Sequence, residues 1–220
     1  MVSDCAVPNS IIEQSQYVVV NPTEYSLKNL ETYRGKEKFV LNLPIVSRED
    51  ETDKIKEIVD SRIFDKFVVN NLYGIGLTRG KKVLPGYGLN LINSQTKLTK
   101  INSFENDSLP SGAIPYIYAK APLMTFCHCP KKVRGGNCAG CKGYDITLTD
   151  DKNQSYALRR YKIKYCYSQL LPLSPLYFGY KKRGFIDLSA EKSEQLEQIF
   201  DKIISGDLPL AEANFARGLK

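Results

Sequence analysis

Four cysteines carry the clearest chemistry in this sequence. A Cys-x-x-Cys pair is preceded by another cysteine, with eight residues between, and is followed by a fourth after twenty-four more residues. A two-residue gap lets both thiolates of the pair reach one metal centre from a tight turn, and Ala139-Gly140 gives the backbone the freedom for that turn. Thiolates bind zinc and iron–sulfur clusters. We therefore predict one metal centre with four ligands: Cys129, Cys138, Cys141 and Cys166.

The spacing favours an iron–sulfur cluster and leaves zinc as the alternative. A structural zinc site more often has two close pairs of cysteines, whereas this chain has one pair and a distant fourth thiol. Pro130 directly follows Cys129, and a Cys-Pro step is common where cysteines bind iron–sulfur clusters. We expect a cluster of the 4Fe–4S type, with ligands that come from separate segments of the chain.

The other thiols and the single histidine have simpler expected roles. On an extended chain Cys127 would point away from Cys129, so we expect a small buried side chain at that position. Cys5 stands alone and is expected to be a structural thiol. His128 could donate a proton or bind the metal, or its ring could be held by neighbouring hydrogen bonds. The crowding of the cysteines argues against disulfides.

The composition is that of an ordinary globular protein. Of the 220 residues, 42% are hydrophobic and 25% are charged, which is typical of one full domain or slightly more. No stretch approaches the roughly 20 apolar residues that span a bilayer, and the N-terminus lacks the pattern of a secretory signal. We therefore expect a cytoplasmic protein without a membrane partner, in a compartment where clustered thiols stay reduced.

The positive charge of the chain is concentrated around the cysteines. Residues 127–187 contain twelve Lys or Arg and four Asp, while the whole chain has a net charge of +7. Seven tyrosines are interleaved with these cations. Cations neutralise phosphates and aromatic rings stack on unpaired bases, so this segment has the composition of an RNA-binding surface. The same cations could instead offset the negative charge of a thiolate cluster or form a solvated face.

Before the cysteines, apolar runs alternate with amphipathic segments. We expect buried strands at 17–20, 39–43, 67–69, 84–92 and 114–118. We expect one helix at 23–33, and a second that follows Ser47 and its acidic turn and continues through Ile63. This alternation predicts an α/β fold with a parallel sheet and helices outside it.

The pattern changes after Cys141. Short strands are expected at 144–149, 157–164 and 184–188, which predicts a small antiparallel element. Ser189 is expected to cap a final helix, whose apolar residues repeat at helical spacing before Gly206. We therefore divide the chain into a first region, 1–126, and a second, cysteine-bearing region, 127–220.

Polar residues follow several of the expected strands. In parallel sheets, functional groups gather at the carboxyl ends of the strands. Carboxamides and a carboxylate there could bind a polar substrate or act in acid–base chemistry, and they could equally cap and end the strands. These strand-end residues are Asn70, Asn71, Asn93, Ser94, Ser103 and Glu105, and the candidate polar set also includes Asn90.

Five segments of the chain share the motifs of one family. They are GYGLNLINS (86–94), Ser103-Phe104-Glu105, APLMTFCHCP (121–130), CAGC (138–141) and FARG (215–218). Together they resemble the collagenase-like peptidase family (peptidase family U, number thirty-two). That family typically has a Leu-Asn-x-x-Asn-Ser strand, a Ser-x-Glu step, a Pro-Leu-Met strand and a Cys-Pro that opens a set of cysteines. The resemblance covers most of residues 38–220 and is most specific around the cysteines.

The resemblance implies a partial (β/α) barrel of the TIM type in residues 1–126, followed by a small cysteine-bearing β/α element. It also implies that the four predicted thiolate ligands hold an iron–sulfur cluster. Better-understood members are oxygen-independent hydroxylases, which act on tRNA or ribosomal RNA bases, with prephenate implicated as hydroxyl source, or on a ubiquinone precursor. The resemblance also makes Arg217, in the position of the family's terminal Arg-Gly motif, a candidate substrate contact. The full set of candidate substrate contacts is Asn90, Asn93, Glu105, Arg159 and Arg217.

Two alternatives to a hydroxylase follow from this resemblance. The family's barrel normally has an N-terminal half before this region, and only about five or six strands are expected here before the cysteines. The chain could therefore be a cluster-bearing partner or scaffold subunit, without activity of its own, that needs an N-terminal barrel-half protein. The second alternative is the peptidase activity in the family name, although the sequence shows no nucleophile–base arrangement.

Overall fold

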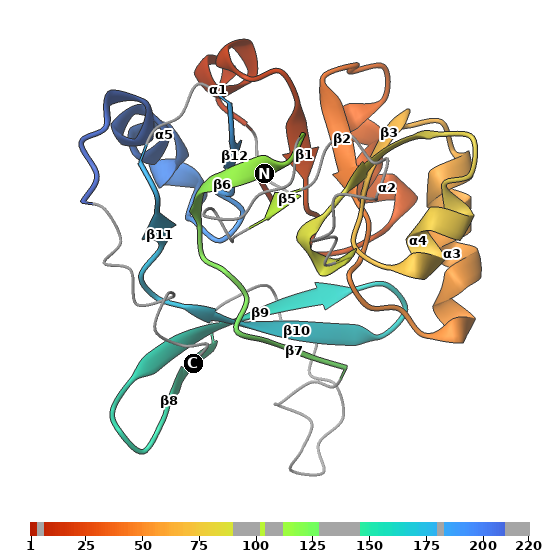
Figure 1. The fold of residues 1–220 in the computed structure, drawn as a ribbon. Coiled ribbons are helices and arrows are strands. Elements are labelled where there is room, and N and C mark those ends of the chain that lie inside the picture. Colours follow the sequence, from red (N-terminus) through yellow and green to blue (C-terminus); the bar gives the residue numbers. More distant parts are fainter. Residues whose placement is uncertain (4–6, 90–101, 104–111, 128–145, 180–182, 210–220) are drawn as a thin grey trace.

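Four parallel strands form the central sheet of the protein (Figure 1). In the computed structural model, the sheet has the order β1 (Val18–Val20), β2 (Phe39–Asn42), β3 (Lys66–Val69) and β4 (Lys82–Pro85). Every neighbouring pair runs parallel, which confirms the parallel sheet of an α/β fold. The structure describes residues 1–3, 7–89, 102–103, 112–127, 146–179 and 183–209.

Short helices connect the strands of the central sheet, because parallel neighbours need a crossover connection. α2 (Leu27–Leu30) and the 3-10 turn η1 (Glu31–Tyr33) precede β2, α3 (Thr52–Asp60) precedes β3, and α4 (Leu72–Leu77) precedes β4. The apolar stripe of α3 is buried in one cluster with Phe67 of β3. This cluster is the largest apolar core of the described residues, and it lies between the helices and one face of the sheet.

A second sheet is built around β6 (Ile114–Ala119). β5 (Asn102–Ser103) and β12 (Phe185–Ile186) pair with β6 in parallel, and β11 (Leu176–Tyr177) pairs with it antiparallel. Two of these strands come from the second predicted region of the chain and pair with a strand of the first. No helix among the described residues is long and apolar enough to cross a bilayer.

The first residues of the chain lie between the two sheets. Val2 forms a parallel bridge with Val20 of β1. Just after β12, the Leu188 N–H donates to the carbonyl oxygen of Met1 at 2.8 Å. These contacts link the central sheet to the sheet around β6. Within the described residues, however, the strands do not close into a barrel.

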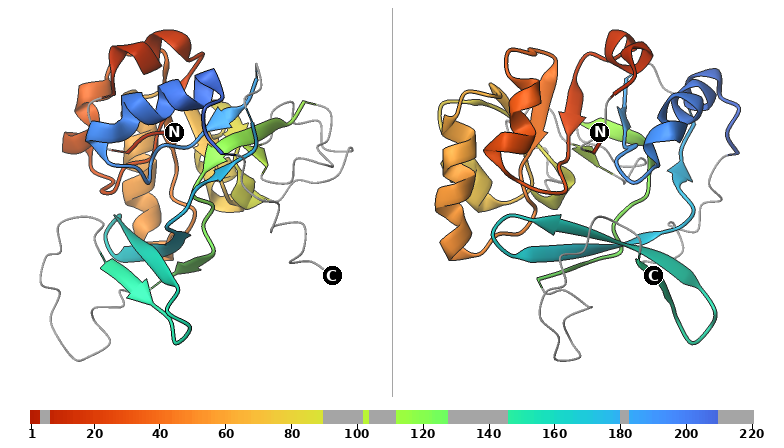
Figure 2. Two further views of the ribbon diagram at one scale, coloured as in Figure 1. Left: turned by 90° about the vertical axis from the view of Figure 1, so that its left-hand side faces the viewer. Right: turned by 180° about the vertical axis from the view of Figure 1, so that it is seen from behind.

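The third sheet confirms a small antiparallel element after the cysteines, built from the strands expected at 144–149 and 157–164; the strand expected at 184–188 is β12 and instead pairs in parallel with β6. Its strands are β7 (Met124–Phe126), β8 (Ile146–Thr149), β9 (Ser155–Lys162) and β10 (Cys166–Pro172), in the order β7-β10-β9-β8. β9 and β10 form the longest pair. Figures 1 and 2 show this sheet across one end of the central sheet. Its side chains share a cavity with residues at the carboxyl ends of the parallel strands, so that is the end it covers.

Two strand assignments from the sequence need correction. The strand expected at 84–92 stops at Pro85, because the chain turns at Gly86 and forms the 3-10 turn η3 (Tyr87–Leu89). β10 was not among the strand ranges expected from the sequence, although it carries the fourth cysteine. Its polar residues fall on both faces, so it lacks the alternation that marks a strand with one solvated face.

The two ends of the chain also differ from expectation. Residues 9–14, for which no helix was expected from the sequence, form α1 (Asn9–Gln14), which packs against α5 (Leu196–Ser205). Ser189 caps no helix, because α5 begins only after the 3-10 turn η6 (Ser193–Gln195). The Ser189 hydroxyl accepts a hydrogen bond from Arg159 instead.

A buried carboxylate joins the central sheet to the antiparallel sheet. Glu51, only 3% exposed, lies at the start of α3. Its Oε1 accepts from the backbone N–H groups of Lys164 and Tyr165 at 3.1 and 2.8 Å, and its Oε2 accepts from the N–H of Arg48 at 2.9 Å. Three donors thus satisfy a charge that has left water. Glu51 therefore fixes the turn from which β10 begins.

Replacing Glu51 with Gln is expected to lower the free energy of unfolding by about 1–3 kcal/mol, because the amide NH2 would face a backbone N–H donor. Urea unfolding followed by circular dichroism measures this change. Glu49→Gln is the matched control, since Glu49 is exposed in the same acidic turn; a change within about 0.5 kcal/mol is expected there. Equal losses in both variants would contradict the bridging role of Glu51.

Candidate functional site

Three asparagines lie side by side where the parallel strands end. Asn21 follows β1, Asn42 ends β2 and Asn70 follows β3. Asn70 Nδ2 donates to Asn42 Oδ1 at 2.8 Å, and Asn42 Nδ2 donates to Asn21 Oδ1 at 2.9 Å. The hydrogen bonds continue from Asn21 Nδ2 to the hydroxyl of Tyr161 at 3.1 Å. We call the three asparagines the asparagine row.

An apolar layer lies directly before the asparagine row along the strands. Because successive side chains alternate between the faces of a strand, the residue two positions before each asparagine shares its face. In all three strands that residue is a buried valine, and the three valines pack in one cluster. We call this cluster the valine layer: Val19, Val40 and Val68.

The antiparallel sheet covers the asparagine row with one of its faces. Arg159 and Tyr161 of β9 pair in register with Gln169 and Tyr167 of β10, and all four line the space next to the row. The rings of Tyr161 and Tyr167 are stacked, with centroids 4.9 Å apart. The cavity that remains has a volume of about 20 Å³, which is room for about one water molecule. We call the asparagine row and these covering side chains the polar edge.

Arg159, one of the predicted substrate contacts, is a buried cation on the wall of this cavity. Only 2% of it is exposed, and its Nη1 donates to Ser189 Oγ at 3.0 Å. Its guanidinium lies 5.4 Å from the centre of the Tyr161 ring. The buried carboxylate of Asp187 lines the same cavity and accepts from the Ser189 N–H at 2.9 Å. Buried charges need such partners, and Arg159 lines the same cavity as the asparagine row.

The segment Gly86-Tyr87-Gly88 closes another side of the polar edge. A Cβ atom on Gly86 would lie 2.1 Å from Asn70 Oδ1, and one on Gly88 would lie 2.5 Å from the carbonyl oxygen of Asn70. Only glycine allows so close an approach. The Tyr87 hydroxyl accepts from Gln169 Nε2 at 3.1 Å and so joins this segment to β10. The glycines of the family-like segment 86–94 are thus explained by packing.

The buried tyrosines near the polar edge stay protonated at neutral pH. Burial raises the pKa of Tyr87, Tyr116 and Tyr167 above the usual value of 10.0. Burial also raises the pKa of Tyr118, and the Glu191 carboxylate, which accepts from its hydroxyl at 2.9 Å, raises it further. These hydroxyls can position a polar group by hydrogen bonding, but a phenol with so high a pKa is a poor general base.

The described part of the cysteine set lies on the antiparallel sheet. Cys166 is half-buried at the start of β10, and Arg160 Nη1 lies 3.7 Å from its Sγ. Cys127 was expected to be buried but is exposed, because it follows β7 at the edge of the sheet. Its carbonyl oxygen accepts from Arg48 Nη2 at 2.7 Å. Outside the described residues lie Cys5, His128, Cys129, Cys138 and Cys141.

Two buried donors without partners lie on the same face as Cys166. Arg160 and Ser168 pair directly across β9 and β10, and Ser168 is two residues from Cys166. Within the described part of the chain, the Ser168 hydroxyl and the Arg160 Nε have no hydrogen-bond partner. An acceptor beside Cys166 would satisfy both. The described residues alone contain no group of three or more metal-ligating side chains, and three of the four predicted ligands fall outside them.

The basic, tyrosine-rich segment lies only partly on the surface. Lys162 pairs with Glu24 at 3.3 Å and Lys164 pairs with Asp50 at 2.9 Å, so part of its charge is offset within the chain. Three of its described tyrosines are buried, namely Tyr161, Tyr167 and Tyr177, and Tyr165 is 40% exposed. Few described rings are therefore placed to stack on bases. The predicted substrate contacts outside the described residues are Asn90, Asn93, Glu105 and Arg217.

Asn21 and Asn42 are site residues that sequence reasoning missed. Asn21 was interpreted as the end of a strand and Asn42 as part of one, whereas Asn70 was expected at a carboxyl end. A usable signal was present, because each of the first three strands reads as an apolar run that finishes in Asn: VVVN, FVLN and FVVN. In a parallel sheet, residues in equivalent positions at the strand ends lie next to one another.

Asn42→Ala is expected to lower the free energy of unfolding by about 1–3 kcal/mol, because Asn21 and Asn70 would each lose a partner. Asn29→Ala is the control, since Asn29 is exposed on α2. The double variant Asn42→Ala/Asn70→Ala should lose less than the sum of the single variants, because the two side chains share one hydrogen bond. Chemical unfolding measures all four variants, and strictly additive losses would contradict a continuous row.

Comparison with known proteins assigns the chain to no family. No family model matches it, and no curated protein or solved structure matches it. The resemblance to the collagenase-like peptidase family therefore stays a prediction that rests on the sequence segments named above. The observations that bear on function are the polar edge and the cysteine-bearing sheet that covers it.

Proposed function

We propose that this chain is an iron–sulfur protein, similar to the collagenase-like peptidase family, that contributes to the oxygen-independent hydroxylation of an RNA base. The position of the cysteine-bearing sheet carries this proposal. β10 begins at Cys166, and its next residues on the opposite face, Tyr167 and Gln169, line the polar edge. α/β proteins bind ligands at the carboxyl ends of their parallel strands, so a metal centre on this sheet would lie close to a substrate bound there.

The surroundings of Cys166 suit a sulfur-rich, negatively charged group. The Arg160 guanidinium lies 3.7 Å from the thiol, and Ser168 adds a buried hydroxyl donor on the same face. Hydrogen bonds to cluster sulfurs and charges nearby tune such centres. Cys166 would hold the cluster together with Cys129, Cys138 and Cys141, and the cluster would supply one-electron transfer. Zinc on the same four thiolates would supply a structural link only.

The polar edge would bind and orient the substrate. The amides of the asparagine row offer both donors and acceptors, as the edges of a base do, and Arg159 would offset negative charge. The buried tyrosines would exclude water while their hydroxyls stay neutral. RNA as the substrate class rests on the positive charge of residues 127–187 and on the resemblance, in a protein that we place in the cytoplasm.

The central sheet would then belong to a partial (β/α) barrel. The valine layer and the asparagine row follow one another along the same face of three neighbouring parallel strands. The parallel pairing of β5, β6 and β12, and the link through Met1 and Val2 to β1, support this arrangement. An N-terminal barrel-half protein could complete it.

The small size of the polar cavity favours a second candidate function. A space of about 20 Å³ holds a water molecule and not a nucleobase. If the covering sheet keeps this position, substrate would have to bind elsewhere. The chain would then be a cluster-bearing partner or scaffold subunit whose active site is provided by another protein.

Protein purified without oxygen is expected to contain about four iron and four sulfide per chain. Cys166→Ser should lose most of the iron and the brown colour, because one of four ligands is removed. Cys127→Ser is the matched control, since Cys127 is the exposed neighbour outside the proposed ligand set. Metal and sulfide analysis decides the result: one zinc without sulfide selects the zinc alternative, and unchanged iron in Cys166→Ser refutes the ligand assignment.

RNA from cells that make this chain is expected to contain a base one oxygen heavier than in RNA from cells that lack it. Mass spectrometry of nucleosides measures the gain, which Cys166→Ser should abolish and Cys127→Ser should retain. A gain that appears only with a second, barrel-half protein selects the subunit alternative. An iron-loaded chain that never changes the RNA would sink the hydroxylation proposal.

A further inference from the structure

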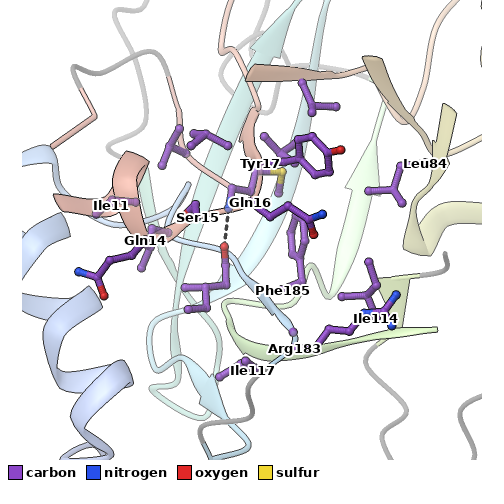
Figure 3. Close-up of a pocket in the computed structure, with 18 of the residues that line it drawn as sticks. Ile11, Gln14, Ser15, Gln16, Tyr17, Leu84, Ile114, Ile117, Arg183 and Phe185 are labelled. Atoms are coloured by element: carbon purple, nitrogen blue, oxygen red, sulfur yellow. Dashed lines mark hydrogen bonds between the residues drawn. The ribbon is translucent and has the colours of Figure 1, made fainter. Parts of the chain in front are cut away.

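A larger cavity lies at the opposite end of the central sheet from the polar edge. Its volume is about 470 Å³, and Figure 3 shows the residues around it. Tyr17 lies just before β1, Lys66 begins β3 and Lys82 begins β4, and all three line the cavity. It therefore lies at the amino ends of the strands, and we call it the amino-end cavity. Volumes of this size are typical of sites for small ligands.

The walls of the amino-end cavity are mostly aliphatic. Val19 and Val40 of the valine layer line it from the central sheet, together with Leu84 of β4. Ile117 of β6 and Phe185 from β12 line it from the second sheet (Figure 3). Leu84 and Phe185 are half-buried, as expected of apolar side chains that border an accessible cavity. An apolar ligand body would remove this surface from water.

The charged side chains that line the cavity are all cations. They are Lys66, Lys82 and Arg183, and no Asp or Glu is present among the described lining residues. Lys66 is already engaged, because its Nζ donates to the Glu37 carbonyl oxygen at 2.8 Å and lies 4.7 Å from the centre of the Tyr17 ring.

Two of these cations are available to a ligand. Lys82 and Arg183 are exposed, and neither side chain forms a hydrogen bond or an ion pair with another described residue. An apolar cavity bordered by positive charge, without a carboxylate to offset it, is complementary to a ligand with an anionic head and an apolar body.

We propose that the amino-end cavity binds a small amphiphilic anion, namely the carboxylate of a medium-chain fatty acid. The tail would contact the valine layer, Leu84 and Phe185, and the carboxylate would pair with Lys82 and Arg183. An aliphatic tail is favoured over an aromatic body because most of the apolar lining is branched aliphatic. The valine layer separates this site from the polar edge, so the proposal does not depend on the metal centre.

Isothermal titration calorimetry of the full chain with decanoate, decanol and decyltrimethylammonium tests the charge preference. Decanoate is expected to bind about tenfold more tightly than either of the others, the gain typical of a charge-assisted pair. Lys82→Met/Arg183→Met should remove that advantage and leave the affinity for decanol unchanged. Lys56→Met is the matched control, since Lys56 is an exposed cation of α3 that does not line the cavity.

A filling variant tests the location. Leu84→Trp should weaken decanoate binding by about tenfold or more, because the larger side chain occupies the space of the tail. Leu72→Trp is its control, since Leu72 is 80% exposed on α4. Circular dichroism checks that each variant folds, and Ile114→Phe provides a second filling variant if Leu84→Trp does not.

Three results would overturn the proposal: no binding of decanoate by the wild-type chain, equal binding of decyltrimethylammonium, or full affinity in a folded filling variant. None of these measurements requires iron or RNA. If decanoate does not bind, the proposed function is therefore unaffected. If a chain without iron still binds decanoate, the proposal for the amino-end cavity stands although the metal centre fails.

Discussion

The arrangement of the two sheets that form the polar edge depends on one buried carboxylate. Glu51 accepts hydrogen bonds from three backbone N–H groups and so ties the start of α3 to the turn before β10. Lys54 reinforces the junction by donating to a carbonyl oxygen of the same turn at 2.7 Å. Arg48 contacts the Cys127 carbonyl oxygen at the end of β7. Because the end of β7 and the turn before β10 are both held from the start of α3, this junction positions Cys127 and Cys166 relative to the central sheet.

The polar edge shows how a buried polar interface keeps a single arrangement. Hydrogen bonds run from Asn70 across the row to Tyr161, and beside them Gln169 donates to the hydroxyl of Tyr87. In a low-dielectric interior such bonds strengthen one another, and an unpaired member is strongly disfavoured. The antiparallel sheet therefore cannot slide by one residue without replacing the side chains that cover the row by those of its opposite face. This close packing leaves space for about one water molecule in the polar edge. A larger substrate must therefore displace some of the side chains of the antiparallel sheet that cover the row.

The sequence predicted most clearly what local periodicity decides. The strands of the central sheet and the stripe of α3 follow from apolar runs that end in Asn, Pro or Gly. β10 was missed because its polar residues fall on both faces, and Gln169 finds its partner in the distant Tyr87, which no local pattern encodes. The strand expected at 84–92 ended early because Gly86 packs against Asn70, a contact between distant segments. Ser189 was expected to cap a helix, but its hydroxyl accepts a hydrogen bond from Arg159. Asn21 and Asn42 were visible as strand ends, but their contact follows only from the register of the sheet.

The valine layer explains why the row is built from amides. It lies between the amino-end cavity and the asparagine row, so the row is shielded from water by apolar side chains on one side and by the tyrosines on the other. Three carboxylates at these positions would repel one another in such surroundings and would need cations beyond Arg159. An amide both donates and accepts, so three of them can satisfy one another in a line across parallel strands. Asn42, the central member, must donate to one neighbour and accept from the other, and of the short side chains asparagine alone offers both groups in a fixed plane. The residue type is thus set by the apolar layer beside it, whatever the site binds.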